Sequence, residues 1–356
     1  MPVIEAAAIE PDGRATAEDV LEVEDLYTYI ATGDGVVRAV DGVSFALREG
    51  EILGLVGESG SGKSVTCRTI AGLMPSPPAR SIGEVRYTGY PGRNLLELRP
   101  AELQRLRGAH ISMIFQDPMS ALNPVMRVGD QIEEAVGAHA QLTAREQRRR
   151  AIALLDRVGI PAPERRLRDY PHEFSGGMRQ RVLIAAAIAS SPRILLADEP
   201  TTALDVIIQD QILSLLLELQ RDSGMSMILV SHDLGVIAEM CDRIAVMYGG
   251  QIVELTDART LLTEPSHPYT ISLLRSLPDA ERKTKYLFSI PGTPPRLVDV
   301  ESGCRFATRC PLATAECRTW ETELLAVAGG AHLVRCRRHD DARRPEAWPQ
   351  QSYESE

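Results

Sequence analysis

The chain has 356 residues, of which 44% are hydrophobic and 25% charged, and these values are typical of a globular protein with one large domain and an appendage, or with two domains. The formal net charge of −10 argues against a nucleic-acid partner, because non-specific binding to nucleic acid needs a basic surface. The N-terminus lacks a basic segment followed by an apolar one, and no apolar run reaches 18 residues, so we expect a cytoplasmic chain that does not cross a membrane.

The first elements are predicted as a tail, two antiparallel strands, a buried strand and a helix. Residues 1–20 are small, acidic and aperiodic, which predicts a flexible tail. Alternating runs at residues 21–30 and 36–50 are typical of antiparallel strands that end in turns. The continuous apolar run at 51–57 predicts a buried parallel strand, and a helical pattern follows at 63–73.

Three segments with different predicted secondary structure follow. Residues from about 95 to 172 are predicted to be mostly helical, with a strongly amphipathic segment at 145–160. From residue 193 to 250, strand and helix patterns alternate, which predicts an α/β fold around a parallel sheet. After about residue 261 prolines multiply, and we expect a separate C-terminal extension over 261–356.

The segment GESGSGKS between the first buried strand and its helix fits the phosphate-binding pattern G-x-x-x-x-G-K-[ST]. Glycines let the backbone curl so that N–H groups point at phosphate oxygens, and the helix N-terminus adds partial positive charge. We expect the lysine to reach the β- and γ-phosphates of ATP and the final serine to bind Mg²⁺. The predicted ATP-binding residues are Gly57, Glu58, Ser59, Gly60, Ser61, Gly62, Lys63 and Ser64.

A second predicted strand ends in two carboxylates, Asp198 and Glu199. Asp198 is expected at the carboxyl edge of the sheet beside the phosphate loop, where it would hold Mg²⁺ together with Ser64. Glu199 would orient or deprotonate an attacking water. Without the phosphate loop upstream, a plain acidic pair that caps a turn would be the better interpretation.

Four further motifs resemble those of the ATP-binding-cassette (ABC) ATPases, in the order found in that family. The serine and glycines of FSGGM start a helix, and the resemblance implies that they contact ATP held by a partner subunit. Gln116 in MIFQDP resembles the glutamine that joins the Mg²⁺ and water shell, and His232 in LVSHD resembles the histidine at the γ-phosphate. Asp205 in TALD resembles the loop that reaches across the dimer. The predicted partner-facing residues are Ser175, Gly176, Gly177 and Met178, the last of which stands where glutamine is common.

The resemblance covers residues 21–260 and implies an ABC-type cassette with an antiparallel β subdomain, a parallel-sheet core and a helical subdomain at about 95–172. One departure concerns adenine, which the family usually stacks on an aromatic side chain four residues after the leucine of the first strand. Counted from Leu26 that position is Ile30, and Tyr29 comes one residue early. Either Tyr29 shifts in position and stacks on adenine, or adenine packs on an aliphatic side chain.

The segments FQDPMSALNP, YPHEFSGGMRQR, HPYTISLLRSLP and IPGTPP resemble the ATPases of dipeptide, oligopeptide and nickel importers. The resemblance implies ATP hydrolysis that drives uptake of peptides, or else of nickel or another small solute. It also implies a peripheral position on the cytoplasmic face of the membrane, a second ATPase subunit, two permease subunits and an external solute-binding protein. A soluble ABC ATPase outside transport is the rival; it usually carries long coiled coils or two cassettes in one chain, and neither occurs here.

Four of the six cysteines lie close to the C-terminus, at positions 304, 310, 317 and 336. In a reducing compartment such a cluster favours metal binding over disulfides. Four thiolates complete the ligand set of a [4Fe–4S] cluster or of tetrahedral zinc. Zinc sites usually contain a tight C-x₂₋₄-C pair, which is absent here, so we favour the cluster and keep zinc as the alternative. Ordinary small buried residues are the third interpretation of Cys304, Cys310, Cys317 and Cys336.

Overall fold

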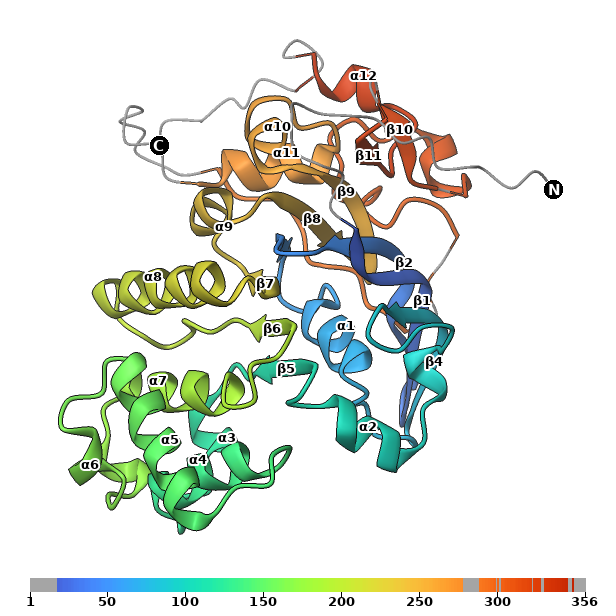
Figure 1. Ribbon diagram of the computed structural model, residues 1–356. Coiled ribbons are helices and arrows are strands. Elements are labelled where there is room, and N and C mark those ends of the chain that lie inside the picture. Colours follow the sequence, from blue (N-terminus) through green and yellow to red (C-terminus); the bar gives the residue numbers. More distant parts are fainter. Residues whose placement is uncertain are drawn as a thin grey trace.

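The computed structural model describes residues 18–277, 288–298, 300, 302–321, 323–327, 330–344 and 348 (Figure 1). The predicted tail at 1–20 lies outside the described residues except for its last three, because strand β1 begins at Asp19.

A three-stranded antiparallel sheet contains the two predicted N-terminal strands. Its order is β2 (Gly35–Arg48), β1 (Asp19–Thr32), β4 (Ala79–Tyr87). The alternation of apolar and polar residues gives this sheet one buried face, and that face packs on the first helix, α1 (Lys63–Ile70). The antiparallel pairing predicted from the sequence is therefore confirmed.

The second sheet has eight strands in the order β10-β11-β9-β8-β3-β7-β6-β5. Five of them are parallel, and three at one end pair antiparallel. Every residue of β3, β6 and β7 is buried, which confirms the buried parallel strand predicted at 51–57 and the parallel sheet predicted from the later alternation. The strand bounds are β3 (Ile52–Val56), β5 (Ile111–Ile114), β6 (Ile194–Asp198), β7 (Ser226–Ser231), β8 (Arg243–Tyr248), β9 (Gln251–Asp257), β10 (Leu325–Val327) and β11 (His332–Val334).

The helices form two groups (Figure 1). Those around the sheet are α1, α8 (Val206–Ser223), α9 (Leu234–Met240), α10 (Ala258–Thr263) and α11 (Pro268–Arg275). A second group lies at the β5 end of the sheet, where α7 packs on β5 and α8. This group comprises α3 (Pro118–Ala121), α4 (Val128–Gly137), α5 (Ala144–Arg157), α6 (Pro163–Arg166) and α7 (Gly176–Ala187). The short elements are η1 (Leu95–Glu97), α2 (Pro100–Leu106), η2 (Pro171–Glu173), η3 (Ala315–Arg318) and α12 (His339–Ala342).

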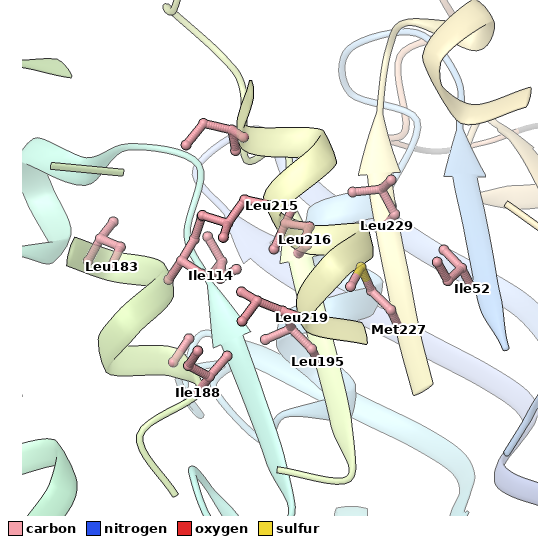
Figure 2. Close-up of a cluster of buried hydrophobic side chains, with 14 of the residues drawn as sticks. Ile52, Ile114, Leu183, Ile188, Leu195, Leu215, Leu216, Leu219, Met227 and Leu229 are labelled. Carbon is pink, nitrogen blue, oxygen red and sulfur yellow. The ribbon is translucent and has the colours of Figure 1, made fainter. Parts of the chain in front are cut away.

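The parallel strands are buried on both faces because two different layers cover them. Leu195 of β6 belongs to the core that includes α7 and α8, shown in Figure 2, whereas Leu196 belongs to the core shared with α1 and the antiparallel sheet. Successive side chains of a strand point to opposite faces, so neighbouring leucines serve both cores. Each such fully buried side chain contributes roughly 1.5–3 kcal/mol relative to exposure.

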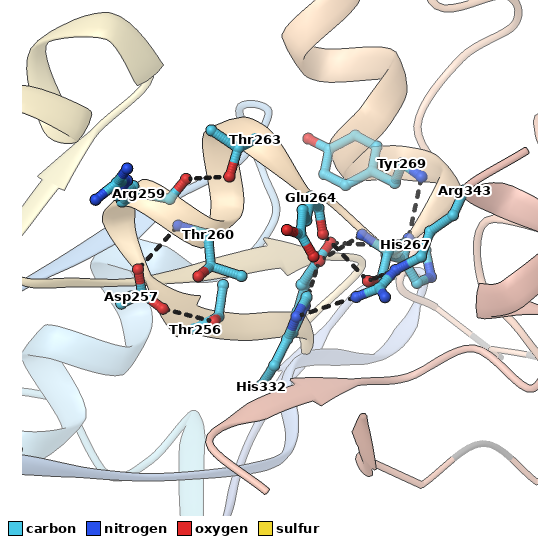
Figure 3. A network of polar contacts seen from close by, with 12 residues as sticks. Thr256, Asp257, Arg259, Thr260, Thr263, Glu264, His267, Tyr269, His332 and Arg343 are labelled. Atoms are coloured by element: carbon cyan, nitrogen blue, oxygen red, sulfur yellow. Dashed lines mark hydrogen bonds and ion pairs between the residues drawn. The ribbon is translucent and has the colours of Figure 1, made fainter. Parts of the chain in front are cut away.

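The C-terminal extension is joined to the central sheet rather than separate from it. β11 pairs antiparallel with β9, where Val334 lies opposite Glu254. The Glu254 carboxylate is fully buried; it lies 2.7 Å from His332 Nε2 and accepts the backbone N–H groups of Ser266 and His267. Figure 3 shows His332, His267 and Arg343 gathered in this network. A buried carboxylate with three partners fixes the extension against the cassette.

Candidate functional site

The predicted phosphate loop connects the buried strand β3 to helix α1, as the motif requires. Gly57, Gly60 and Gly62 all have positive φ, of 152°, 78° and 108°. A Cβ on Gly57 would lie 2.1 Å from the Met247 carbonyl oxygen, and one on Gly62 would lie 2.4 Å from that of Ala39. Only glycine fits these positions, so the loop can curl around an anion.

Lys63 opens α1, and its side chain is buried against the loop. Its ammonium group donates hydrogen bonds to the carbonyl oxygens of Gly57 (2.7 Å) and Glu58 (3.0 Å). Burial lowers the pKa of Lys63, and the nearby carboxylates of Glu199 and Asp198 oppose that effect. The lysine thus places a positive charge inside the loop.

Asp198 ends β6 directly beside α1. Its Oδ1 accepts a hydrogen bond from the Ser64 hydroxyl at 2.7 Å. Its Oδ2 is buried and has no hydrogen-bond partner in the part of the chain described here. Burial raises the pKa of Asp198, and the Ser64 hydrogen bond partly offsets this. A buried carboxylate oxygen without a partner is suited to a cation or to water held by one.

Glu199 lies at the centre of the predicted catalytic residues. Its Oε2 accepts hydrogen bonds from Gln116 Nε2 (3.0 Å) and from the Thr202 hydroxyl (2.8 Å), and His232 Nδ1 lies 3.6 Å away. Gln116 follows β5, Glu199 follows β6 and His232 follows β7, and these strands are neighbours in the sheet. Carboxyl ends of parallel strands share one edge, which brings together residues more than a hundred positions apart.

Two features of this cluster were missed from the sequence. Thr202 was not singled out, although it follows the acidic pair by only three residues. Glu199 itself has a φ of 46°, a left-handed conformation that is uncommon outside glycine. Strain of this kind persists where the surroundings hold a residue in place, as the two hydrogen bonds to Glu199 do.

The predicted partner-facing residues start helix α7, where Ser175 is the N-cap and its hydroxyl accepts the Met178 N–H at 3.3 Å. This arrangement leaves the first N–H groups of α7, those of Gly176 and Gly177, at an exposed helix start. Asp205 is the N-cap of α8, and it accepts the Ile208 N–H at 3.0 Å. The two residues after Asp205 are apolar yet exposed, with 79% for Val206 and 72% for Ile207.

The side chain of Tyr29 is held by Asp41 of strand β2. Its hydroxyl donates to Asp41 Oδ1 at 2.7 Å, and burial, together with this hydrogen bond, raises the pKa of Tyr29 to about 12. Its neighbour Thr28 points to the opposite face, where its hydroxyl lies 2.9 Å from that of Thr69 in α1. Alternation along β1 puts Ile30 on the Thr28 side. The structure thus places Tyr29 and Ile30 on opposite faces of β1, and the residue that stacks on adenine stays a prediction.

Four cysteines of the extension line one pocket together with His267 and Trp320; they are Cys304, Cys310, Cys317 and Cys336. Burial raises the pKa of Cys304, and it raises those of Cys310 and Cys336 to about 12. His267 Nδ1 accepts the Tyr269 N–H, and the buried Nε2 has no partner among the described residues.

The zinc alternative lacks the ligand group that it needs. Zinc holds four ligands at about 2.0–2.3 Å, so the ligand atoms must lie close together. Within the described ranges, no three histidine, cysteine, aspartate or glutamate side chains could hold a metal ion. The four thiols line one pocket, and the iron–sulfur prediction stays a proposal.

The curled loop with its buried lysine, the Ser64–Asp198 pair and the Gln116–Glu199–His232 cluster define a nucleotide-binding cassette of the P-loop class. The chain matches the ABC transporter family over residues 40–202 and the oligopeptide/dipeptide transporter C-terminal region over residues 253–317. It therefore belongs to the ABC transporter ATP-binding proteins, in the group that carries this C-terminal region.

Relatives of known name and structure agree. The chain is 47% identical to the dipeptide transport ATP-binding protein DppD of Bacillus subtilis, over 90% of this chain and 94% of that protein. It is 45% identical to the oligopeptide transport ATP-binding protein OppD of Escherichia coli, over 89% and 93%. Among solved structures, a dimeric ATP-binding cassette in a post-hydrolysis state with ADP and Pi aligns with a TM-score of 0.59 and 29% identity, over 67% of this chain and 99% of that one. No helix in the described part of the chain has the length and apolar character that a membrane crossing requires.

Proposed function

We propose that the chain is the ATP-binding and ATP-hydrolysing subunit of an ABC importer for dipeptides or oligopeptides. The observation that carries the ATPase proposal is Glu199, held by Gln116 and Thr202 next to His232 at the sheet edge that also presents Lys63 and Asp198. The names of the relatives support a peptide as the solute. Nickel or another small solute is the alternative for the same machinery.

The residues divide the chemistry among them. The N–H groups of the phosphate loop and the Lys63 ammonium bind the β- and γ-phosphates. Glu199 accepts the proton of the attacking water, Gln116 helps to orient that water, and His232 contacts the γ-phosphate. Adenine packs on the aliphatic surface at Ile30 rather than on Tyr29, whose hydroxyl is held by Asp41.

The residues present fit Mg²⁺. Ser64, Asp198 and Gln116 would hold it, and the unpartnered Oδ2 of Asp198 is the observation that favours a cation there. When bound, Mg²⁺ neutralises charge on the phosphate oxygens.

A working unit of two cassettes is part of the proposal. Ser175–Met178 make their hydrogen bonds within α7, so their exposed helix start is available to ATP held by a partner. The exposed apolar residues Val206 and Ile207 beside Asp205 would be covered in such a dimer. Two permease subunits and an external solute-binding protein complete the importer, with this chain peripheral on the cytoplasmic face.

The test has two stages. The purified chain should bind ATP with Mg²⁺ in an equilibrium assay, and the matched variant Lys63→Ala should bind it much more weakly. Membrane vesicles containing the complex should then accumulate a labelled dipeptide in an ATP-dependent manner, and Glu199→Gln should stop accumulation. Failure of the chain to bind ATP would refute the ATPase proposal. ATP-dependent uptake of nickel, without uptake of the peptide, would refute the proposal that the solute is a peptide.

The four-thiol pocket is proposed to hold a [4Fe–4S] cluster. Four cysteines around one pocket supply its full ligand set. The arginines that line the pocket, including Arg337 and Arg338, would offset the negative charge of the ligated cluster. The bound cluster would stabilise the fold of an extension that is poor in regular secondary structure.

Anaerobic purification with iron and sulfide analysis and a visible spectrum tests this proposal. We expect about four irons per chain, lost in Cys310→Ser and kept in the control Cys241→Ala, whose cysteine lies in the core outside the pocket. Absence of iron from the wild-type chain would refute the cluster.

A further inference from the structure

Glu58, the second residue of the phosphate loop, is held by residues of the C-terminal extension. Its carboxylate accepts two hydrogen bonds from Arg309, one from Nη1 at 2.8 Å and one from Nη2 at 3.1 Å. Its backbone N–H donates to the Tyr269 hydroxyl at 2.9 Å. The loop is therefore fixed at this residue through both its side chain and its backbone, by groups about 210 and 250 positions away.

Arg309 is itself rigidly placed. It is 7% exposed, its Nε donates to the Pro291 carbonyl oxygen at 2.8 Å, and its Nη1 also donates to the Tyr248 hydroxyl at 3.1 Å. Tyr248 ends β8, the strand beside β3, from which the phosphate loop emerges. A planar guanidinium that pairs in two-pronged fashion while anchored on its other side has one orientation available.

We propose that Arg309 is a positioning residue for the phosphate loop, through which the C-terminal extension sets the affinity of the cassette for ATP. The inference rests on the proposed function, because it assigns to this loop the binding of ATP phosphates. The physical reason is preorganisation. A loop with three glycines loses much conformational freedom when its N–H groups are aligned on phosphate, and a loop already fixed at Glu58 loses less.

The same contacts connect the loop to the thiol pocket. Cys310 follows Arg309 directly, and Phe306, which also lines the pocket, packs on Tyr248 and Tyr269 with ring centroids 5.2 and 5.4 Å apart. Both side chains that hold Glu58 therefore adjoin residues of the pocket.

The experiment measures the dissociation constant of MgATP for the full chain and its variants, with thermal unfolding as a check on folding. Arg309→Gln should weaken ATP binding roughly tenfold, which corresponds to loss of part of a charged hydrogen-bond pair. The control is Arg343→Gln. Arg343 is also an arginine of the extension with a hydrogen bond to hold, since its Nε donates to the Ser266 hydroxyl at 2.8 Å, but its contacts among the described residues are Ser266 and His332 rather than Glu58. This control should change ATP affinity by no more than about twofold.

A double variant separates positioning from simple charge neutralisation. If Arg309 only cancelled the charge of Glu58, then Arg309→Gln with Glu58→Ala would bind ATP like the wild type. If Arg309 positions the loop, the double variant stays clearly weaker than the wild type, and Arg309→Gln adds little to Glu58→Ala. Wild-type affinity in Arg309→Gln or in the double variant, or an equal loss in Arg343→Gln, would overturn the proposal. If the wild-type chain does not bind ATP, the proposed function is refuted, and the positioning role of Arg309 is refuted with it.

Discussion

Glu199→Gln is the substitution that tests the catalytic cluster most directly. The glutamate Oε2 accepts hydrogen bonds from Gln116 and Thr202, and the amide oxygen of a glutamine can accept both. The side chain should therefore keep its place and size, and only its capacity to take a proton is lost. Loss of a positioned general base lowers a rate by roughly 10²–10⁴-fold, or about 2.7–5.5 kcal/mol in activation free energy.

The assay is steady-state ATP hydrolysis by the purified complex, in which any second ATPase subunit already carries the corresponding glutamine. ATP affinity is measured in parallel and should stay within about twofold of the wild type, because neither Lys63 nor the loop is altered. Thr202→Val serves as a graded control, since it removes one hydrogen bond to the carboxylate and leaves the base present. Its rate should fall by about tenfold. Hydrolysis by Glu199→Gln at more than a tenth of the wild-type rate would refute the assignment.

Three other substitutions test the loop, the partner site and the anchoring of the extension. Lys63→Ala should weaken ATP binding by at least about tenfold, because it removes the charge inside the loop, and wild-type affinity in the equilibrium assay would contradict this. Ser175→Arg should abolish hydrolysis by the assembled complex while this chain still binds ATP; in the wild type, hydrolysis per chain should rise with protein concentration, and a fully active monomer at high dilution would refute the shared site. Glu254→Ala should destabilise the extension by about 3 kcal/mol or more, because it leaves His332 and two buried N–H groups without their hydrogen-bond partner. Glu254→Gln should cost less stability. Limited proteolysis of the extension and thermal unfolding would measure this, and an unchanged cleavage rate in Glu254→Ala would contradict it.

Local chemistry made much of the cassette predictable from the sequence alone. The phosphate loop could be recognised because a curl around phosphate requires glycines at fixed spacing, and Gly57 and Gly62 occupy positions where any Cβ would strike backbone. The continuous apolar run at 51–57 predicted a strand that is covered on both faces, and the structure confirms it in β3. These features depend on residues that are neighbours in the chain.

The tertiary structure decided what depends on contacts between distant segments. Alternation along β1 does not reveal which face meets α1, so only the structure shows Tyr29 turned toward Asp41 and Ile30 on the other side. A three-residue strand such as β11 carries too little pattern to predict its partner, and its pairing with β9 joins the extension to the cassette. The pairing of Arg309 with Glu58 has no local signature at all, because the two residues are 251 positions apart and meet only when the extension folds onto the sheet.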